Sequence, residues 1–183
     1  MFPVGGIEVM LAGAALALVV CAGLAWLLVR GGLDRRSALV FAGFFWTLAV
    51  IALVTLIPVG GPPGVVPAES RLGRCSWDIG GPAPDGFWIF QGGQRALNTA
   101  LFVPSGSLLV VAVARWGWWG VVLGAWGLLF LALFSGGLEL TQLALARLDR
   151  ACDVTDIIDN VTGALIGAVV GVGLAMLVRP WRR

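Results

Sequence analysis

The sequence predicts an all-α integral membrane protein, a bundle of about five transmembrane helices with one long extracytoplasmic loop. The chain is 59% hydrophobic and only 12% charged, whereas soluble domains carry about 25% charged residues. It also contains five hydrophobic runs near the roughly 20 residues that a spanning helix needs. Because the backbone in lipid must satisfy its own hydrogen bonds, we expect each run to be a helix.

The five runs divide the 183-residue chain into one bundle and its connections. No segment is long enough for a separate soluble core. The predicted spans are residues 7–29, 37–59, 96–114, 118–140 and 157–178. We therefore expect a transmembrane hairpin at 1–59, an extracytoplasmic loop at 60–95, a three-helix unit at 96–178 and a cytoplasmic tail at 179–183.

The long loop at 60–95 is rich in proline and glycine. A loop of this length is either functional or poorly structured. Its apolar stretch at 87–90 could lie along the membrane surface or pack over the bundle as a lid, and we leave both alternatives open.

The arginines set the predicted orientation, because cytoplasmic segments carry an excess of basic residues. Seven of the twelve arginines lie at one side, which we assign to the cytoplasm; they are Arg30, Arg35, Arg36, Arg115, Arg179, Arg182 and Arg183. The N-terminus is then extracytoplasmic and the C-terminus cytoplasmic. Trp116, Trp118 and Trp119 fall at a predicted helix end, where indole rings anchor in the headgroup zone.

The cysteines and the lack of histidine narrow the chemistry. The chain has three cysteines and no histidine, which disfavours membrane hydrolases that depend on a histidine base or ligand. Cys75 and Cys152 both fall outside the cytoplasm, where a disulfide is chemically permitted. Cys21 is expected to be a small packing residue in the first helix. No basic run points to a nucleic-acid partner.

Polar residues interrupt the apolar pattern at the outer end of the fourth run. Ser135, Glu139 and Gln142 are spaced i, i+4, i+7 and so share one helix face. A carboxyl group at a membrane boundary must find a partner, bind a cation or take up a proton.

A second polar stretch leads into the fifth run. It contains Arg150, Asp153, Asp156 and Asn160. Asp153 or Thr155 could cap the helix, but capping does not explain Asn160 a turn further in. The face of Asn160 continues as Gly163, Gly167 and Gly171, a small-residue pattern that allows close helix packing in membranes.

The third stretch is at the start of the third run, where Asn98 precedes Pro104. Proline removes a helical hydrogen bond and favours a kink, which can leave carbonyl groups to line a cavity. A capping asparagine followed by a tolerated proline explains the same residues equally well.

The outer ends of the fourth and fifth runs together are net acidic. The acids there either are protonated, bind a cation or face solvent. Carboxylate oxygens suit Mg²⁺ or Mn²⁺, so Glu139, Asp153 and Asp156 are candidate metal ligands. We expect Asp149 and Asp159 to be merely solvated.

The order and spacing of these residues resemble the VanZ-like family across residues 95–178. The resemblance rests on Asn98, Phe102, Pro104 and Gly106, then Ser135, Glu139 and Gln142, then Arg150, Asp153, Asp156, Asn160, Gly163 and Gly167. Thr155 stands where members often carry an acid, and Asp159 where they carry an apolar residue. The resemblance implies a small membrane protein of Gram-positive bacteria and their relatives, associated with resistance to teicoplanin and related lipidated glycopeptides.

Three functions fit these observations. The first is a non-catalytic protein that binds a lipid-linked cell-wall precursor or a lipoglycopeptide at the outer leaflet, with membrane lipid around it. The second is a membrane enzyme that uses Mg²⁺ or Mn²⁺ on a lipid or cell-wall precursor, with Arg150 pairing a phosphate. The third is a purely structural network. The functional polar residues are expected to be Asn98, Ser135, Glu139, Gln142, Arg150, Asp153, Asp156 and Asn160.

Overall fold

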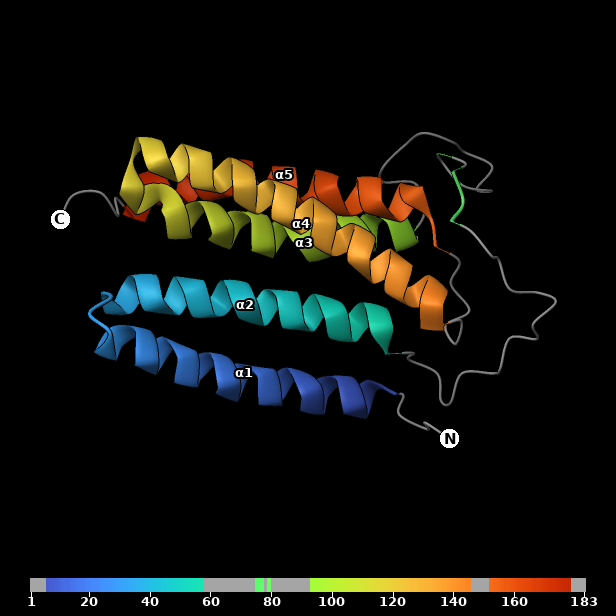
Figure 1. Cartoon of the computed structure of the whole chain (residues 1–183), viewed down its shortest axis with the longest axis horizontal. Helices are drawn as coiled ribbons and strands as arrows, with labels where there is room; N and C mark the ends of the chain where they lie inside the picture. The colour runs from blue at the N-terminus through green and yellow to red at the C-terminus, as the bar shows by residue number, and fades with distance from the viewer. Residues whose placement is uncertain (1–5, 58–74, 78, 80–92, 146–151, 179–183) are drawn as a thin grey trace.

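The computed structural model describes residues 6–57, 75–77, 79, 93–145 and 152–178 (Figure 1). These residues form five long helices and one short 3₁₀ turn. In chain order they are α1 (Ile7–Arg30), α2 (Arg35–Leu56), α3 (Gly93–Val113), η2 (Ala114–Trp116), α4 (Trp118–Leu145) and α5 (Val154–Val178). All five long helices have the length and hydropathy to cross a membrane, so the predicted fold class is confirmed.

The helix ends differ from the prediction by up to five residues. α4 continues to Leu145 and α5 begins at Val154, so polar residues that we placed at helix ends are partly inside helices. α3 runs through Pro104 without a break in its assignment. The apolar stretch at 87–90 lies outside the described residues.

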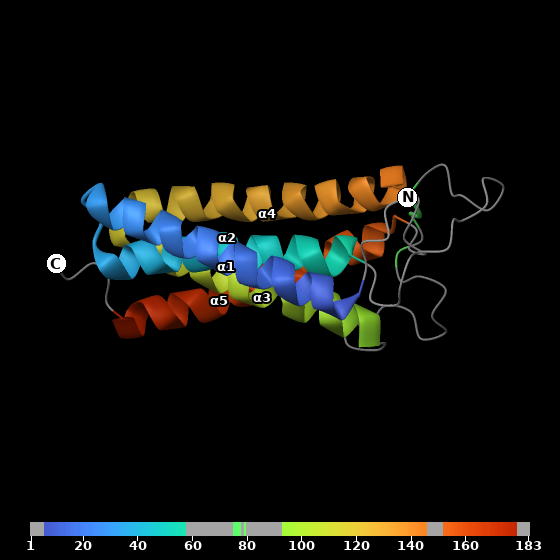
Figure 2. The same cartoon turned by 90° about the horizontal axis from the view of Figure 1, so that it is seen from below.

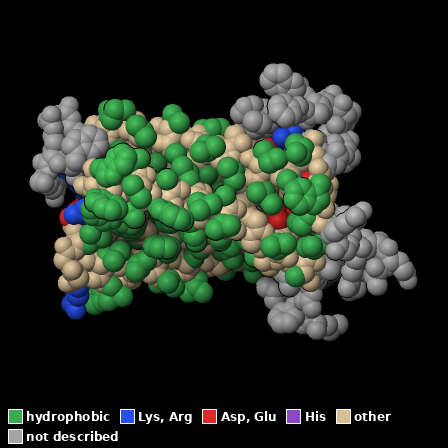
Figure 3. Space-filling view, turned by 45° about the horizontal axis from the view of Figure 1, so that its top comes forward, with side chains coloured by type: hydrophobic (Ala, Val, Ile, Leu, Met, Phe, Trp, Pro, Cys, Tyr) green, Lys and Arg blue, Asp and Glu red, His purple; other side chains and the backbone are tan. Residues whose placement is uncertain are grey.

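The five long helices lie roughly along one common axis, and α5 ends at the opposite end of the bundle from the start of α1 (Figures 1 and 2). We call the end where α1, α3 and α5 begin the loop end, and the opposite end the connector end. Apolar side chains cover the middle of the face in Figure 3, and charged atoms lie only toward its two ends. That distribution is the one a bilayer requires, because charges are costly in the hydrocarbon core.

At the connector end, α1 turns tightly into α2. Gly32 has a φ of 92°, a conformation that costs glycine little. Asp34 then caps α2 by accepting a hydrogen bond from the Ser37 backbone N–H at 3.0 Å. The Arg115 guanidinium donates to Asp34 at 2.7 Å and so joins this turn to the η2 segment.

The core lies between α2, α3 and α4. Phe102 is fully buried and its ring lies 6.4 Å from that of Phe134, centroid to centroid. Ser105 donates to the Thr47 hydroxyl at 2.9 Å, which links α3 to α2 inside the core. α1 packs mainly on α2, where Trp46 Nε1 donates to the Ala14 carbonyl at 3.0 Å. Cys21 is buried in α1, as predicted.

α3 and α5 lie in direct backbone contact. A Cβ on Gly163 or Gly167 would overlap the carbonyl oxygen of the facing α3 residue, and one on Gly171 would lie 2.6 Å from the Ser107 carbonyl oxygen. The Ser107 hydroxyl donates to the Gly167 carbonyl at 2.9 Å. The predicted close-packing role of these glycines is confirmed, and we call this contact the α3–α5 seam.

A disulfide joins Cys75 to Cys152 just before α5. The pairing that the sequence left open is therefore present. The Ser76 N–H donates to the Cys152 carbonyl at 2.8 Å and the Val154 N–H donates to the Ser76 carbonyl at 3.1 Å. The short segment around Cys75 is thus fastened beside the first residues of α5.

Candidate functional site

The predicted polar residues that the structure describes gather at the loop end of α3, α4 and α5. We call this group the polar cluster. Five of them are buried by their neighbours although their side chains are polar. The polar cluster comprises Asn98, Ser135, Glu139, Gln142, Asp153, Asp156 and Asn160.

The three α4 residues share one inward face, as their spacing predicts. Ser135, Glu139 and Gln142 are 0%, 4% and 3% exposed. Asn160 Nδ2 donates to Ser135 Oγ at 2.9 Å, and Gln142 Nε2 donates to the Thr55 carbonyl at 2.9 Å. α4 therefore holds α5 with one residue and α2 with another, and these bonds fix the rotation of the helix.

Glu139 is the buried carboxyl group of the polar cluster. Its Oε2 accepts a hydrogen bond from the Asp153 backbone N–H at 3.1 Å. Asp153 in turn caps α5, because its Oδ1 accepts from the Thr155 N–H at 2.8 Å. The positive end of the α5 dipole thus lies beside two carboxyl groups, an arrangement that favours negative charge there.

Asn98 and Thr99 bring unused hydrogen-bonding capacity to the same depth. Asn98 is 9% exposed, and its side chain makes no hydrogen bond within the described part of the chain. The Thr99 hydroxyl oxygen is buried and has no hydrogen-bond partner there either. Asn98 lies one helical turn from Phe102, which packs beside Phe134, so it is level with the Glu139 turn of α4. Buried polar groups are normally satisfied, so these two could accept a ligand or water.

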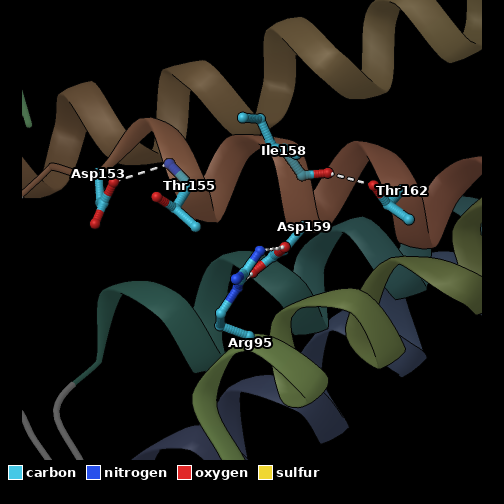
Figure 4. Close-up of polar contacts among 6 residues, drawn as sticks. All are labelled: Arg95, Asp153, Thr155, Ile158, Asp159 and Thr162. Atoms are coloured by element: carbon cyan, nitrogen blue, oxygen red, sulfur yellow. Dashed lines mark hydrogen bonds and ion pairs between the residues drawn. The ribbon is translucent and has the colours of Figure 1, made fainter. Parts of the chain in front are cut away.

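Asp159 is not solvated, and our prediction for it is wrong. Its side chain is fully buried and accepts two hydrogen bonds from Arg95, Nε to Oδ2 at 2.8 Å and Nη2 to Oδ1 at 2.9 Å (Figure 4). Arg95 is 12% exposed. A planar guanidinium matches a carboxylate in this two-point geometry, so the pair joins the start of α3 to α5.

The spacing of the α3–α5 seam accounts for this pair once Gly163 is known to face Thr99. Along α5, Asp159 lies four residues before Gly163, which faces Thr99. Along α3, Arg95 lies four residues before Thr99. Because the two helices run in the same direction and contact one another every four residues, the first contact of the seam is Arg95 with Asp159.

Asp149, which we expected to be solvated, and Arg150, which we expected to pair a phosphate, lie outside the described residues. The proposed phosphate partner is therefore not placed. Among the described side chains, no three His, Cys, Asp or Glu residues come together as a metal site. Glu139 and Asp153 are adjacent through a backbone bond rather than as paired ligands.

The polar cluster presents hydroxyl, amide and carboxyl groups rather than imidazole or thiol groups. Ser135 already accepts from Asn160, and histidine is missing from the chain. What remains is a set of carboxyl, amide and hydroxyl groups in a partly water-excluded setting, where each hydrogen bond is stronger than in water.

Fold and site together define a multi-pass helical membrane protein with a buried polar cluster at one end. The sequence model of the VanZ/LLP1 family matches residues 44–178. The chain therefore belongs to the VanZ-like family, and the match reaches back into α2, beyond the segment 95–178 on which the resemblance rested. Comparisons with curated proteins and with solved structures gave no match.

Proposed function

We propose that this protein binds a lipid-linked or lipidated ligand at the outer leaflet through the polar cluster, and so contributes to resistance to teicoplanin and related lipoglycopeptides. The observation that carries the proposal is the burial of Glu139 at 4% exposure, together with a buried Thr99 hydroxyl that has no hydrogen-bond partner among the described residues. Polar groups within a membrane are costly and usually serve function.

The disulfide supports the orientation that this function needs. Cys75 and Cys152 are bonded at the loop end, and disulfides persist in oxidising compartments rather than in the cytoplasm. The arginine distribution also favours an extracytoplasmic loop end. With the loop end extracytoplasmic, the polar cluster lies at the depth of the outer headgroups, where a lipidated ligand would present its polar part.

Several interactions of the polar cluster are structural, and they do not account for all its members. Asn160 to Ser135 and Gln142 to Thr55 hold helices together. Polar bonds between membrane helices contribute only about 0.6–2 kcal/mol each. The buried Thr99 hydroxyl has no hydrogen-bond partner among the described residues, which favours a ligand over a purely structural network.

Glu139→Gln in a susceptible host tests the proposal. Glu8→Gln is the matched control, because Glu8 is an exposed carboxylate near the same end of the bundle. We expect the Glu139 variant, extracted as a monodisperse protein, to lose protection against teicoplanin while vancomycin susceptibility is unchanged. The control should retain protection.

Full protection by a well-folded Glu139→Gln protein would contradict a role for the polar cluster in resistance. No protection by the unmodified chain would mean that resistance does not extend to this member. Equilibrium dialysis with Mn²⁺ on the same preparations checks the alternative, a divalent-metal-dependent enzyme. Stoichiometric binding that Asp153→Asn or Asp156→Asn abolishes would favour that enzyme.

A further inference from the structure

α1 and α2 form an apolar groove in the half of the bundle nearest the loop end. It has a volume of about 570 Å³. Small residues line it on both helices, Gly13 and Ala17 on α1 and Ala49 and Ala52 on α2, and the Leu53 side chain lies against Gly13. Every side chain that lines it is apolar, so the groove suits hydrocarbon and offers nothing to a polar group.

The groove is nearly as long as the hydrocarbon part of one leaflet is thick. On α1 it extends from Gly13 to Cys21, and on α2 from Ala49 to Ile57, each about 12 Å at 1.5 Å per residue. Half of a 30 Å hydrocarbon core is about 15 Å. Ile57 directly follows the last residue of α2, so the groove opens at the loop end.

The groove reaches the last turn of α2, which also contacts the polar cluster. Leu56 lines the groove and follows Thr55, whose carbonyl accepts the Gln142 amide at 2.9 Å. Ala52 and Leu56 also pack against the core beneath the polar cluster. The polar cluster and the apolar groove therefore lie within one turn of each other along α2, in the same leaflet.

We propose that this groove binds the acyl chain of the lipidated ligand whose polar part meets the polar cluster. The inference rests on the proposed function and adds a second subsite to it. An amphiphile needs an apolar surface beside a polar one, and here the groove residue Leu56 directly follows Thr55, which accepts a hydrogen bond from the polar-cluster residue Gln142. A second apolar groove, of about 460 Å³, is lined by residues such as Gly124 and Ala125 and lies at the connector end, the opposite end of the bundle from the polar cluster.

The test uses a teicoplanin-type lipoglycopeptide with a photoreactive diazirine in its acyl chain. The full-length protein is placed in nanodiscs of phosphatidylglycerol and phosphatidylcholine, irradiated, and mapped by mass spectrometry. We expect saturable labelling of the groove walls on α1 and α2. Ala17→Leu with Ala49→Leu should reduce it at least about tenfold, because a pocket discriminates by that much per methylene.

Two variants separate the subsites. Ala125→Leu narrows the groove at the connector end and should leave labelling unchanged. Glu139→Gln should reduce total binding wherever the acyl chain lies. If labelling falls outside α1 and α2 while Glu139→Gln still abolishes it, the groove proposal is overturned and the proposed function stands. If the unmodified protein shows no saturable labelling, both are overturned.

The alkylation rate of Cys21 provides a test of the groove that needs no substitution. It lines the groove and is the free cysteine of a chain whose other two are bonded. Unlabelled lipoglycopeptide at saturation should slow the alkylation of Cys21 by a lipid-soluble maleimide severalfold. An unchanged alkylation rate under saturated binding would overturn the groove as the acyl site.

Discussion

Breaking the Arg95–Asp159 pair from one side should destabilise the protein strongly. The Asp159 side chain is fully buried, Arg95 is 12% exposed, and the two N–O distances are 2.8 and 2.9 Å. Removing one partner of such a pair leaves an uncompensated buried charge, which costs roughly 3–5 kcal/mol in the free energy of unfolding. Arg95→Met should cost more than Asp159→Asn, because an arginine left alone can extend its long stem toward water.

The double variant Arg95→Met with Asp159→Asn should recover most of this loss, because apolar or neutral replacement of a buried pair is often near neutral. The assay is unfolding by sodium dodecyl sulfate in mixed micelles, followed by the fluorescence of the nine tryptophans. Arg115→Met with Asp34→Asn gives a matched cycle on a pair whose side chains are each 32% exposed. There we expect a coupling of about 0.2–1 kcal/mol. Equal coupling in the two cycles would refute the reasoning from burial.

Three further predictions concern the seam, the connector end and the disulfide. Gly163→Ala should lower the free energy of unfolding by roughly 1–3 kcal/mol through overpacking against a backbone carbonyl, whereas Gly173→Ala, with nothing within 4 Å of its Cβ, should not; equal effects would contradict close contact at the seam. The Ser37 N–H and hydroxyl, with a smaller contribution from Arg115, lower the pKa of Asp34 from 3.8 to about 2. The stability that this gives is present above about pH 4 and lost as pH falls toward 2, so acid titration of the unfolding midpoint should flatten there in Asp34→Asn, and an unchanged titration would argue against the shift. Unreduced protein in denaturant should show one thiol by mass after alkylation and three after reduction, and three thiols from the start would exclude the bond in the cell.

Hydropathy sufficed to predict five helices long and apolar enough to cross a membrane, since lipid forces each apolar run to be helical. The spacing of Ser135, Glu139 and Gln142 also predicted their common face, because helical geometry fixes which residues share a side. The glycine repeat on α5 likewise predicted a close contact. Local rules were enough for these features, because each depends on residues of a single helix.

Asp159 is a residue whose burial the rules for a single helix did not predict. Read along its own helix, it is one more acid near a helix start, where acids are ordinary. Its burial depends on Arg95, 64 residues earlier on another helix. The alignment of α3 with α5 had to be known before the two residues could be paired. The sequence left the disulfide pairing undecided for the same reason, because spacing in the chain does not show which two cysteines meet.

The four-residue repeat of the α3–α5 seam does not by itself fix how far along α3 the α5 helix lies, and the Arg95–Asp159 pair does. Glycines every four residues would face carbonyl oxygens again if α5 slid along α3 by one helical turn, so packing alone distinguishes such slips poorly. A slip in one direction would leave Arg95 facing Gly163, and a slip in the other would leave Asp159 facing Thr99. Each stranded charge would cost about 2.5–3.5 kcal/mol at membrane depth. The ion pair therefore selects one alignment from several near-equivalent ones, and with it the height at which Asn160 reaches Ser135.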